Sequence, residues 1–139
     1  MKPDVARVAL IAHDEKKPAL VEIVQAYEDI LSNFDLVGTG TTAKRLMRET
    51  DLNIERKRSG SVGGDVQIAA EVVEGDIDGV IFLRDPSIAQ PHEADINALL
   101  RACTVHNVPI ASVPVAAEFL IEALYRKESY NSGWRLRMK

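Results

Sequence analysis

Cysteine is almost missing from this sequence: Cys103 is the only one in 139 residues. A single cysteine excludes a disulfide bond within the chain, and with it the disulfide-stabilised secreted folds. A chain of this length can bury a substantial core without such a crosslink. We therefore expect a protein of a reducing compartment, the cytoplasm.

Long apolar runs and an excess of basic residues are also missing. The run from Val8 to Ala12 ends at His13, too early for a signal peptide, and no stretch approaches the roughly 20 apolar residues of a membrane span. Lysine and arginine number 17 against 21 aspartates and glutamates, a formal net charge of −4. This balance argues against a nucleic-acid surface but permits a local basic pocket for a small anion. We expect neither membrane nor nucleic acid as a partner.

The sequence does contain a regular alternation of two patterns. Nearly continuous β-branched runs predict strands buried on both faces, over 5–12, 35–38, 52–57, 78–83 and 108–113. Segments with apolar residues on one helical face predict helices, over 17–34, 41–50, 66–75, 96–107 and 116–127. Without repeats or linkers, this order predicts a single-domain α/β fold over residues 1–139. We expect three layers, αβα, with a mostly parallel five-stranded sheet and a polar C-terminal tail at 128–139.

Polar residues gather directly after each expected strand. The segments are HDEKK, GTGTT, RSGSVGGD, RDPSIAQPHEAD and SVPVA. In a parallel sheet such segments meet at the carboxyl edge, where ligands of these folds bind. The sequence therefore predicts one composite site at this edge.

The segment GTGTTA (38–43) has the form G-x-G-x-x-A, which is typical of dinucleotide-binding loops. Such a loop normally follows the first strand, with an acidic residue about 20 positions later. Here it follows the second strand, and Glu55, 15 positions beyond Gly40, has no supporting context. We therefore reject a dinucleotide. A single phosphate at the helix N-terminus and a threonine-rich turn with a helix cap both remain open.

Two further segments each allow a catalytic or a structural interpretation. In AHDEKK (12–17), Lys17 could meet a phosphate as a point charge, or the run could be a solvated helix start capped by Asp14. In SGSVGGD (59–65), Asp65 could be a base held at a fixed angle, or an ordinary N-cap. A helix N-terminus would weaken Asp65 as a base, so catalysis would need desolvation or a stabilised product oxyanion.

The segment DPSIAQPHEAD (85–95) contains carboxylates and His92 without a recognised metal-ligand spacing. We therefore expect no metal and no cofactor, and interpret His92 as a proton donor or carbonyl polariser. His106 precedes a strand and is interpreted as structural. Cys103 lies on an apolar helix face and is interpreted as core.

Four segments in this order resemble the methylglyoxal synthase family: AHDEKK, GTGTT, SGSVGGD and DPSIAQPHEADINALLR (85–101). The resemblance covers roughly residues 8–124. It implies a parallel α/β fold, a homohexamer, and conversion of dihydroxyacetone phosphate to methylglyoxal and inorganic phosphate without metal or cofactor. Phosphate would be a product and also an inhibitor.

The resemblance also assigns site residues one by one. Asp65 matches the general base, and His92 matches the histidine near the substrate's carbonyl and hydroxyl oxygens. Asp14 and Asp95 match two further active-site carboxylates. The matches to the substrate- and phosphate-binding set are His13, Lys17, Thr39, Gly40, Thr41, Thr42, Ser59 and Gly60.

The chain departs from the family pattern at Ser61, often a proline in relatives, at Arg84, often aromatic or uncharged, and at Ser112-Val113, often Thr-Asn. Relatives send a tail arginine into a neighbouring subunit's phosphate site, and Arg135 and Arg137 are the candidates here. Two other functions stay open: a regulatory effector-binding module of the same fold, and a metal-dependent phosphohydrolase that uses the same carboxylates.

Overall fold

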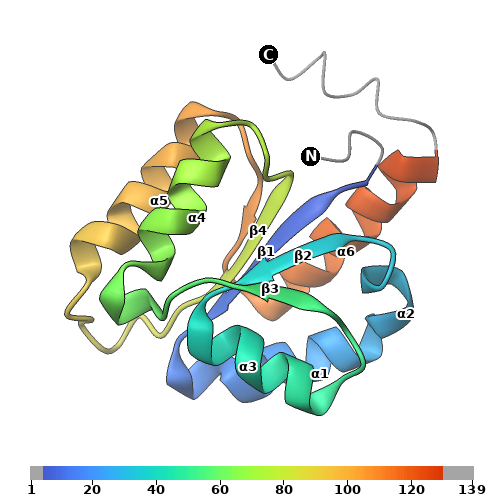
Figure 1. Ribbon diagram of the computed structural model, residues 1–139, viewed down its shortest axis with the longest axis horizontal. Helices are drawn as coiled ribbons and strands as arrows, with labels where there is room; N and C mark the ends of the chain where they lie inside the picture. The colour runs from blue at the N-terminus through green and yellow to red at the C-terminus, as the bar shows by residue number, and fades with distance from the viewer. Residues whose placement is uncertain (1–4, 130–139) are drawn as a thin grey trace.

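The computed structural model describes residues 5–129 (Figure 1). The sequence-based expectations for Arg135 and Arg137 lie outside the described residues. The strands are β1 (Arg7–Ala12), β2 (Asp35–Gly38), β3 (Ile54–Arg56), β4 (Gly79–Leu83) and β5 (Ile110–Ala111). The α-helices are α1 (Lys17–Ala26), α2 (Glu28–Leu31), α3 (Gly40–Glu49), α4 (Gly64–Val73), α5 (Glu93–Val105) and α6 (Pro114–Ser129). Two short 3-10 helices, η1 (Asp14–Lys16) and η2 (Gly60–Val62), follow β1 and β3.

The five strands form one sheet in the order β3-β2-β1-β4-β5, and every neighbouring pair is parallel. The strand order reverses between β1 and β4, where Ala12 is paired with Leu83. In open parallel sheets the crevice beyond the carboxyl ends at this reversal is the usual ligand site. The expected five-stranded αβα fold is confirmed, and the site is expected around His13 and Asp85.

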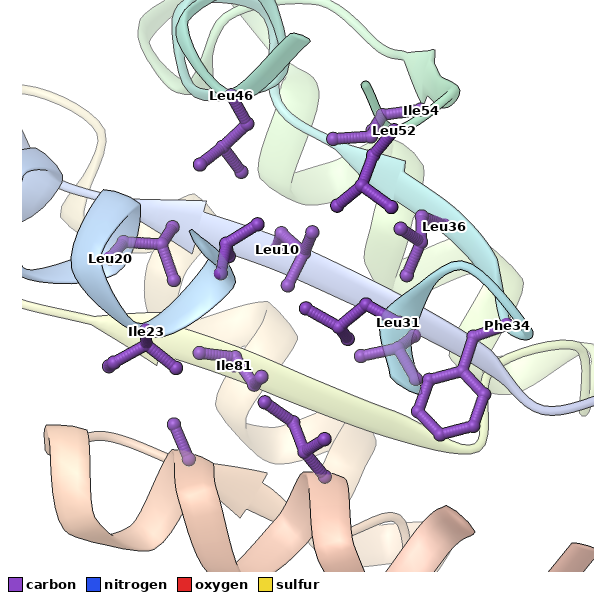
Figure 2. Close-up of a cluster of buried hydrophobic side chains, with 14 of the residues drawn as sticks. Leu10, Leu20, Ile23, Leu31, Phe34, Leu36, Leu46, Leu52, Ile54 and Ile81 are labelled. Atoms are coloured by element: carbon purple, nitrogen blue, oxygen red, sulfur yellow. The ribbon is translucent and has the colours of Figure 1, made fainter. Parts of the chain in front are cut away.

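Helices cover both faces of the sheet, as Figure 1 shows, with α4 and α5 side by side on one face and α1, α2, α3 and α6 on the other. Alternate residues of β1 pack into two hydrophobic clusters, one on each face of the sheet. Leu10 packs with α1, α3 and α6 in the cluster of Figure 2, whereas Ile11 packs with Ile68 of α4 and Leu99 of α5. Burial on both faces explains the continuous apolar run of β1. Within residues 5–129 no helix is both long and apolar enough to cross a membrane.

The structure differs from the sequence-based elements at two helices. The expected helix 17–34 is interrupted at Tyr27, whose hydroxyl donates to Glu118 of α6 at 3.0 Å. The expected loop 84–95 is too long, because α5 already begins at Glu93. Glu93 and Asp95 therefore lie in the first turn of a helix, where its positive end favours carboxylates.

A charged network ties the amino half of the sheet to α4. Arg7 at the start of β1 donates to Glu71 of α4 at 2.8 Å and to Glu55 of β3 at 2.9 Å. Lys57 pairs with the same two carboxylates, each at 2.8 Å. Burial alone would raise the pKa of Glu71, but hydrogen bonds from Arg7 and Lys57 hold that pKa below its usual value. The carboxylate of Glu55 is thus engaged by Arg7 and Lys57.

Replacing Glu71 with glutamine should lower stability without changing the pocket. The variant loses charge-assisted hydrogen bonds, each worth about 1.5–3 kcal/mol, and Glu71 is partly exposed, so the lower end is expected. A depressed pKa contributes stability that is present above the ordinary glutamate pKa of about 4.3 and is lost as the pH falls through the folded-state value. Urea unfolding at pH 7 and pH 3 measures both effects. If wild type exceeds Glu71→Gln in free energy of unfolding by the same amount at pH 3 as at pH 7, the conclusion that ionised Glu71 stabilises the fold is contradicted.

Candidate active site

A pocket of about 520 Å³ opens at the carboxyl edge of the sheet, where the loops after β1, β2, β3 and β4 meet. Most of the residues predicted from the sequence line it: His13, Asp14, Lys17, Thr39, Thr41, Thr42, Ser59, Gly60, Asp65 and His92. Gly40 and Asp95 do not line it. The pocket therefore gathers residues from four of the five polar segments that follow the strands, and no residue of the fifth, SVPVA, lines it.

One side of the pocket is suited to an anion. The helix α3 begins at Gly40, and its first-turn N–H groups have no partners within the helix. Thr39 and Thr42 are buried, and Thr42 Oγ1 lies 3.3 Å from both the N and the O of Ala12. Lys17 is also buried and donates to the Ala12 carbonyl at 2.9 Å. Thr39 occupies the N-cap position, as the cap interpretation expects, but makes no side-chain cap hydrogen bond.

Glycines allow the loops of this side to approach closely. A Cβ on Gly40 would lie 2.8 Å from Ser59 Oγ and 2.9 Å from Ser59 N, so only glycine lets α3 start against the β3 loop. A Cβ on Gly64 would collide with the carbonyl oxygen of Arg58. Gly63 has a φ of 105°, a left-handed conformation that side-chain-bearing residues rarely adopt. The two glycines before Asp65 thus fix where α4 begins.

Asp65 is a buried carboxylate at the start of α4. Its exposed fraction is 1%, it lies in the first turn of α4, and neither oxygen has a hydrogen-bond partner among residues 5–129. Burial raises the pKa of Asp65, against the opposing charge of His92 and together with the charge of Asp95. The N-cap of α4 is Gly63, so the N-cap interpretation of Asp65 is wrong. Desolvation supplies the compensation that a base at a helix N-terminus requires.

His92 faces this carboxylate from the other side of the pocket. Its Nε2 lies 3.7 Å from Oδ2 of Asp65, too far for a hydrogen bond. A Cβ on Gly60 would lie 2.9 Å from His92 Nε2 and 3.3 Å from Asp65 Oδ1. The glycine therefore preserves the space between acid and imidazole in which a reacting carbon could sit.

His13 adds a second imidazole, held in one tautomer. Its Nδ1 accepts a hydrogen bond from the backbone N–H of Asp85 at 3.0 Å, which leaves the proton of the neutral ring on Nε2. That Nε2 is buried and has no partner among the described residues. Burial lowers the pKa of His13, and the nearby charges of His92, Arg84 and Lys17 lower it further. His13 is therefore a neutral hydrogen-bond donor at neutral pH.

The two remaining predicted carboxylates are placed less centrally. Asp14 lies in η1 with a side chain that is 95% exposed, and it accepts a hydrogen bond from Lys17 at 2.8 Å. This bond and the charge of Lys17 lower the pKa of Asp14. Asp95 is outside the pocket lining, although its charge reaches Asp65. Catalytic roles for both stay predictions.

Sequence reasoning missed some lining residues, notably Ile88 and Gln90 from the loop after β4. Neither carries a chemical signature; their position in that loop was the available signal. The structural interpretation of Cys103 is confirmed, since it is buried in the core and burial raises its pKa to about 11. His106 is exposed at the opposite end of α5 from His92. In the described part of the chain, no group of three or more His, Cys, Asp or Glu side chains is placed to hold a metal ion.

The fold and the pocket define a single-sheet α/β domain whose strand-end loops surround a pocket lined by Lys17, the start of α3 and a buried carboxylate. A family model of this class, described as the MGS-like domain, matches residues 19–112. Methylglyoxal synthase of Alkaliphilus metalliredigens (strain QYMF) is 52% identical over 132 residues, 95% of this chain and 96% of that protein. Methylglyoxal synthase of Burkholderia mallei (strain SAVP1) is 50% identical over 126 residues, 91% of this chain and 97% of that protein.

A solved structure gives the same result. The crystal structure of methylglyoxal synthase from Elizabethkingia anophelis NUHP1 superimposes with a TM-score of 0.80 at 39% identity, covering 86% of this chain and 78% of that chain. The chain belongs to the methylglyoxal synthase family. The resemblance carried by the four sequence segments is thereby confirmed.

Proposed function

We propose that this chain is a carbon–oxygen lyase that converts dihydroxyacetone phosphate to methylglyoxal and inorganic phosphate. Family membership supports the activity. The observation that carries the chemistry is the unpartnered, buried carboxylate of Asp65, which lies across a gap from His92 and in the same pocket as Lys17 and the start of α3. We assign these groups as the base, the oxyanion donor and the phosphate subsite of one cavity.

In the first step Asp65 removes a proton from the hydroxymethyl carbon of the substrate. The electron pair of that C–H bond forms a carbon–carbon double bond, and the carbonyl oxygen becomes the enediolate oxyanion. Nε2 of His92 and the Nε2–H of His13 are the donors placed to stabilise this charge. The raised pKa of Asp65 makes it a stronger base than an exposed aspartate.

In the second step the enediolate expels phosphate. The hydroxyl group on the deprotonated carbon gives up its proton and becomes the aldehyde oxygen, the carbon–carbon double bond shifts to the phosphate-bearing carbon, and the electron pair of the bond between that carbon and the ester oxygen leaves with inorganic phosphate. The resulting enolate takes up a proton at its terminal carbon to give methylglyoxal. Lys17 and the N–H groups of the first turn of α3 would stabilise the growing charge of the leaving group. These steps use no oxidant or reductant, because the substrate and the two products together are at the same oxidation level.

Lys17→Ala should weaken binding of substrate and of inorganic phosphate together, since both use the same charge. A charge-assisted contact of this kind is worth about 1.5–3 kcal/mol, or roughly a tenfold to hundredfold loss of affinity. Calorimetric titration with phosphate and the KM for dihydroxyacetone phosphate measure the two effects. Lys16→Ala is the matched control, because Lys16 is the neighbouring lysine and does not line the pocket. A loss confined to the substrate would exclude Lys17 from a shared phosphate subsite.

The two alternative functions are tested together with the main one. Chelator-treated protein is incubated with dihydroxyacetone phosphate, and methylglyoxal and phosphate are assayed in the same sample. Equal amounts of both products support the lyase. Phosphate with dihydroxyacetone, abolished by the chelator, would indicate a metal-dependent phosphohydrolase, and phosphate binding without turnover would indicate an effector-binding module.

We further propose a cytoplasmic homohexamer in which a tail arginine, Arg135 or Arg137, reaches the phosphate subsite of a neighbouring subunit. The resemblance to the family supports this assembly. Large exposed apolar side chains on α6, including Phe119 at 70% exposure, offer surface for contacts between copies. Deleting residues 134–139 should reduce phosphate affinity while light scattering reports the assembly mass. Unchanged affinity in the truncated protein would remove the tail from the site.

A further inference from the structure

The segment between β4 and α5 is connected to the pocket at both of its ends. At its start, the backbone N–H of Asp85 holds Nδ1 of His13 at 3.0 Å. At its end, His92 places Nε2 3.7 Å from Asp65. The residues in between, 86–89, are exposed, so their own packing does little to fix the distance between the two ends.

One ion pair joins the two residues that flank this segment. Arg84, the residue before Asp85, places Nη2 3.6 Å from Oε2 of Glu93, the residue after His92. Oε1 of Glu93 accepts a hydrogen bond from the backbone N–H of Gln90 at 3.1 Å. The ion pair therefore joins the two ends of the segment. Glu93 also fixes the backbone within the segment, at Gln90.

We propose that Arg84 is a positioning residue for the reaction: its ion pair with Glu93 fixes the segment 85–92, and with it the Asp85 amide against His13 and the His92 ring against Asp65. The inference rests on the proposed function for the reaction that it serves. Arg84 is not among the pocket-lining residues, so it acts through the two histidines and not on the substrate.

The Arg84–Glu93 pair also affects the pKa of His13 through the charges of its two members. The charged groups near this ring are Asp14 in η1, Lys17 in α1, Arg84 and Asp85 after β4, and His92 and Glu93 at the start of α5. Burial is the largest cause of the lowered pKa of His13; Arg84 lowers it further, whereas Glu93 opposes. Without Arg84, one of the charges that lower the pKa of His13 is removed while Glu93 remains, so that pKa should rise. Protonated His13 carries a hydrogen on Nδ1 and can no longer accept the Asp85 hydrogen bond.

Two variants, each of which neutralises one partner of the ion pair, distinguish the positioning role of the pair from its effect on the charge near His13. Arg84→Gln and Glu93→Gln both remove the ion pair, and each should lower kcat for dihydroxyacetone phosphate about tenfold or more, the effect of small misplacements in an active site. KM should change less, because the phosphate subsite is intact. NMR titration of the His13 ring should show a raised pKa in Arg84→Gln but no rise in Glu93→Gln. The acid limb of the kcat profile should move in the same directions. Arg84→Lys keeps the charge and should recover most of the activity.

The matched control is the Arg45–Glu49 pair on α3. It has the same 3.6 Å separation and similar side-chain exposures, 34% and 35% against 32% and 40% for Arg84 and Glu93. Arg45→Gln should leave kcat and the His13 titration unchanged, and thermal unfolding of all variants should stay close to wild type, since exposed ion pairs stabilise little. If Arg84→Gln behaves like Arg45→Gln in either kcat or the His13 pKa, the inference is wrong.

Failure of this inference can be distinguished from failure of the proposed function. A wild-type protein that leaves dihydroxyacetone phosphate unchanged contradicts the lyase activity. The NMR titration needs no substrate and still decides the role of Arg84: a raised His13 pKa in Arg84→Gln supports it, and an unmoved pKa overturns it.

Discussion

Asp65→Asn is expected to lower turnover of dihydroxyacetone phosphate by about two to four orders of magnitude, the range for losing general base catalysis. The carboxylate is buried, has a raised pKa and makes no hydrogen bond among the described residues, so its oxygens are available to a substrate proton. Asparagine has nearly the same shape but cannot accept that proton. Initial rates of methylglyoxal formation measure the loss.

A second buried aspartate serves as the control for Asp65. Asp78 lies before β4, at the amino edge of the sheet, and its carboxylate accepts the backbone N–H of Arg7 at 2.8 Å. Asp78→Asn should cost stability and leave kcat close to wild type. Near-normal turnover by Asp65→Asn would reassign the base, with Asp14 and Asp95 as the next candidates.

His92→Gln should lower kcat by about 10²–10³, the range for removing one donor to an oxyanion. The ring at the start of α5 is the group that faces Asp65 across the space kept by Gly60, so its loss leaves the enediolate oxygen without a donor on that side. KM should change less than kcat, because the oxyanion forms only as the reaction proceeds.

His106→Gln is the matched control for His92. His106 lies at the other end of the same helix and is exposed. Its replacement should leave both kinetic constants near wild type. Equal losses in the two variants would mean that the effect of His92→Gln arises from the stability of α5 and not from the site.

The fold could be predicted from the sequence where burial leaves a strong pattern. The central strands β1 and β4 are buried on both faces and appear as continuous apolar runs. The edge strand β5 was expected over 108–113 but pairs with β4 only at Ile110 and Ala111. Proline at positions 109 and 114 lacks the backbone donor that a longer ladder would use.

The location of the site was also predictable, because polar segments after parallel strands must meet at one edge. The tautomer of His13 was not, since it depends on the backbone N–H of Asp85, and a main-chain donor has no sequence signature. The exposure of Asp14 and the burial of Asp65 could not be predicted from the sequence either. Both lie in the first turn of a helical segment that follows a strand, and only tertiary packing makes one exposed and the other buried.

The central claim is that the pocket removes a proton from carbon and then expels phosphate. Proton and phosphorus NMR of one reaction, started with chelator-treated protein and dihydroxyacetone phosphate, follow both products at once. We predict that methylglyoxal and inorganic phosphate appear at equal rates in wild type, and that both rates fall together in Asp65→Asn. Phosphate release without methylglyoxal, or unchanged rates in the variant, would contradict the account.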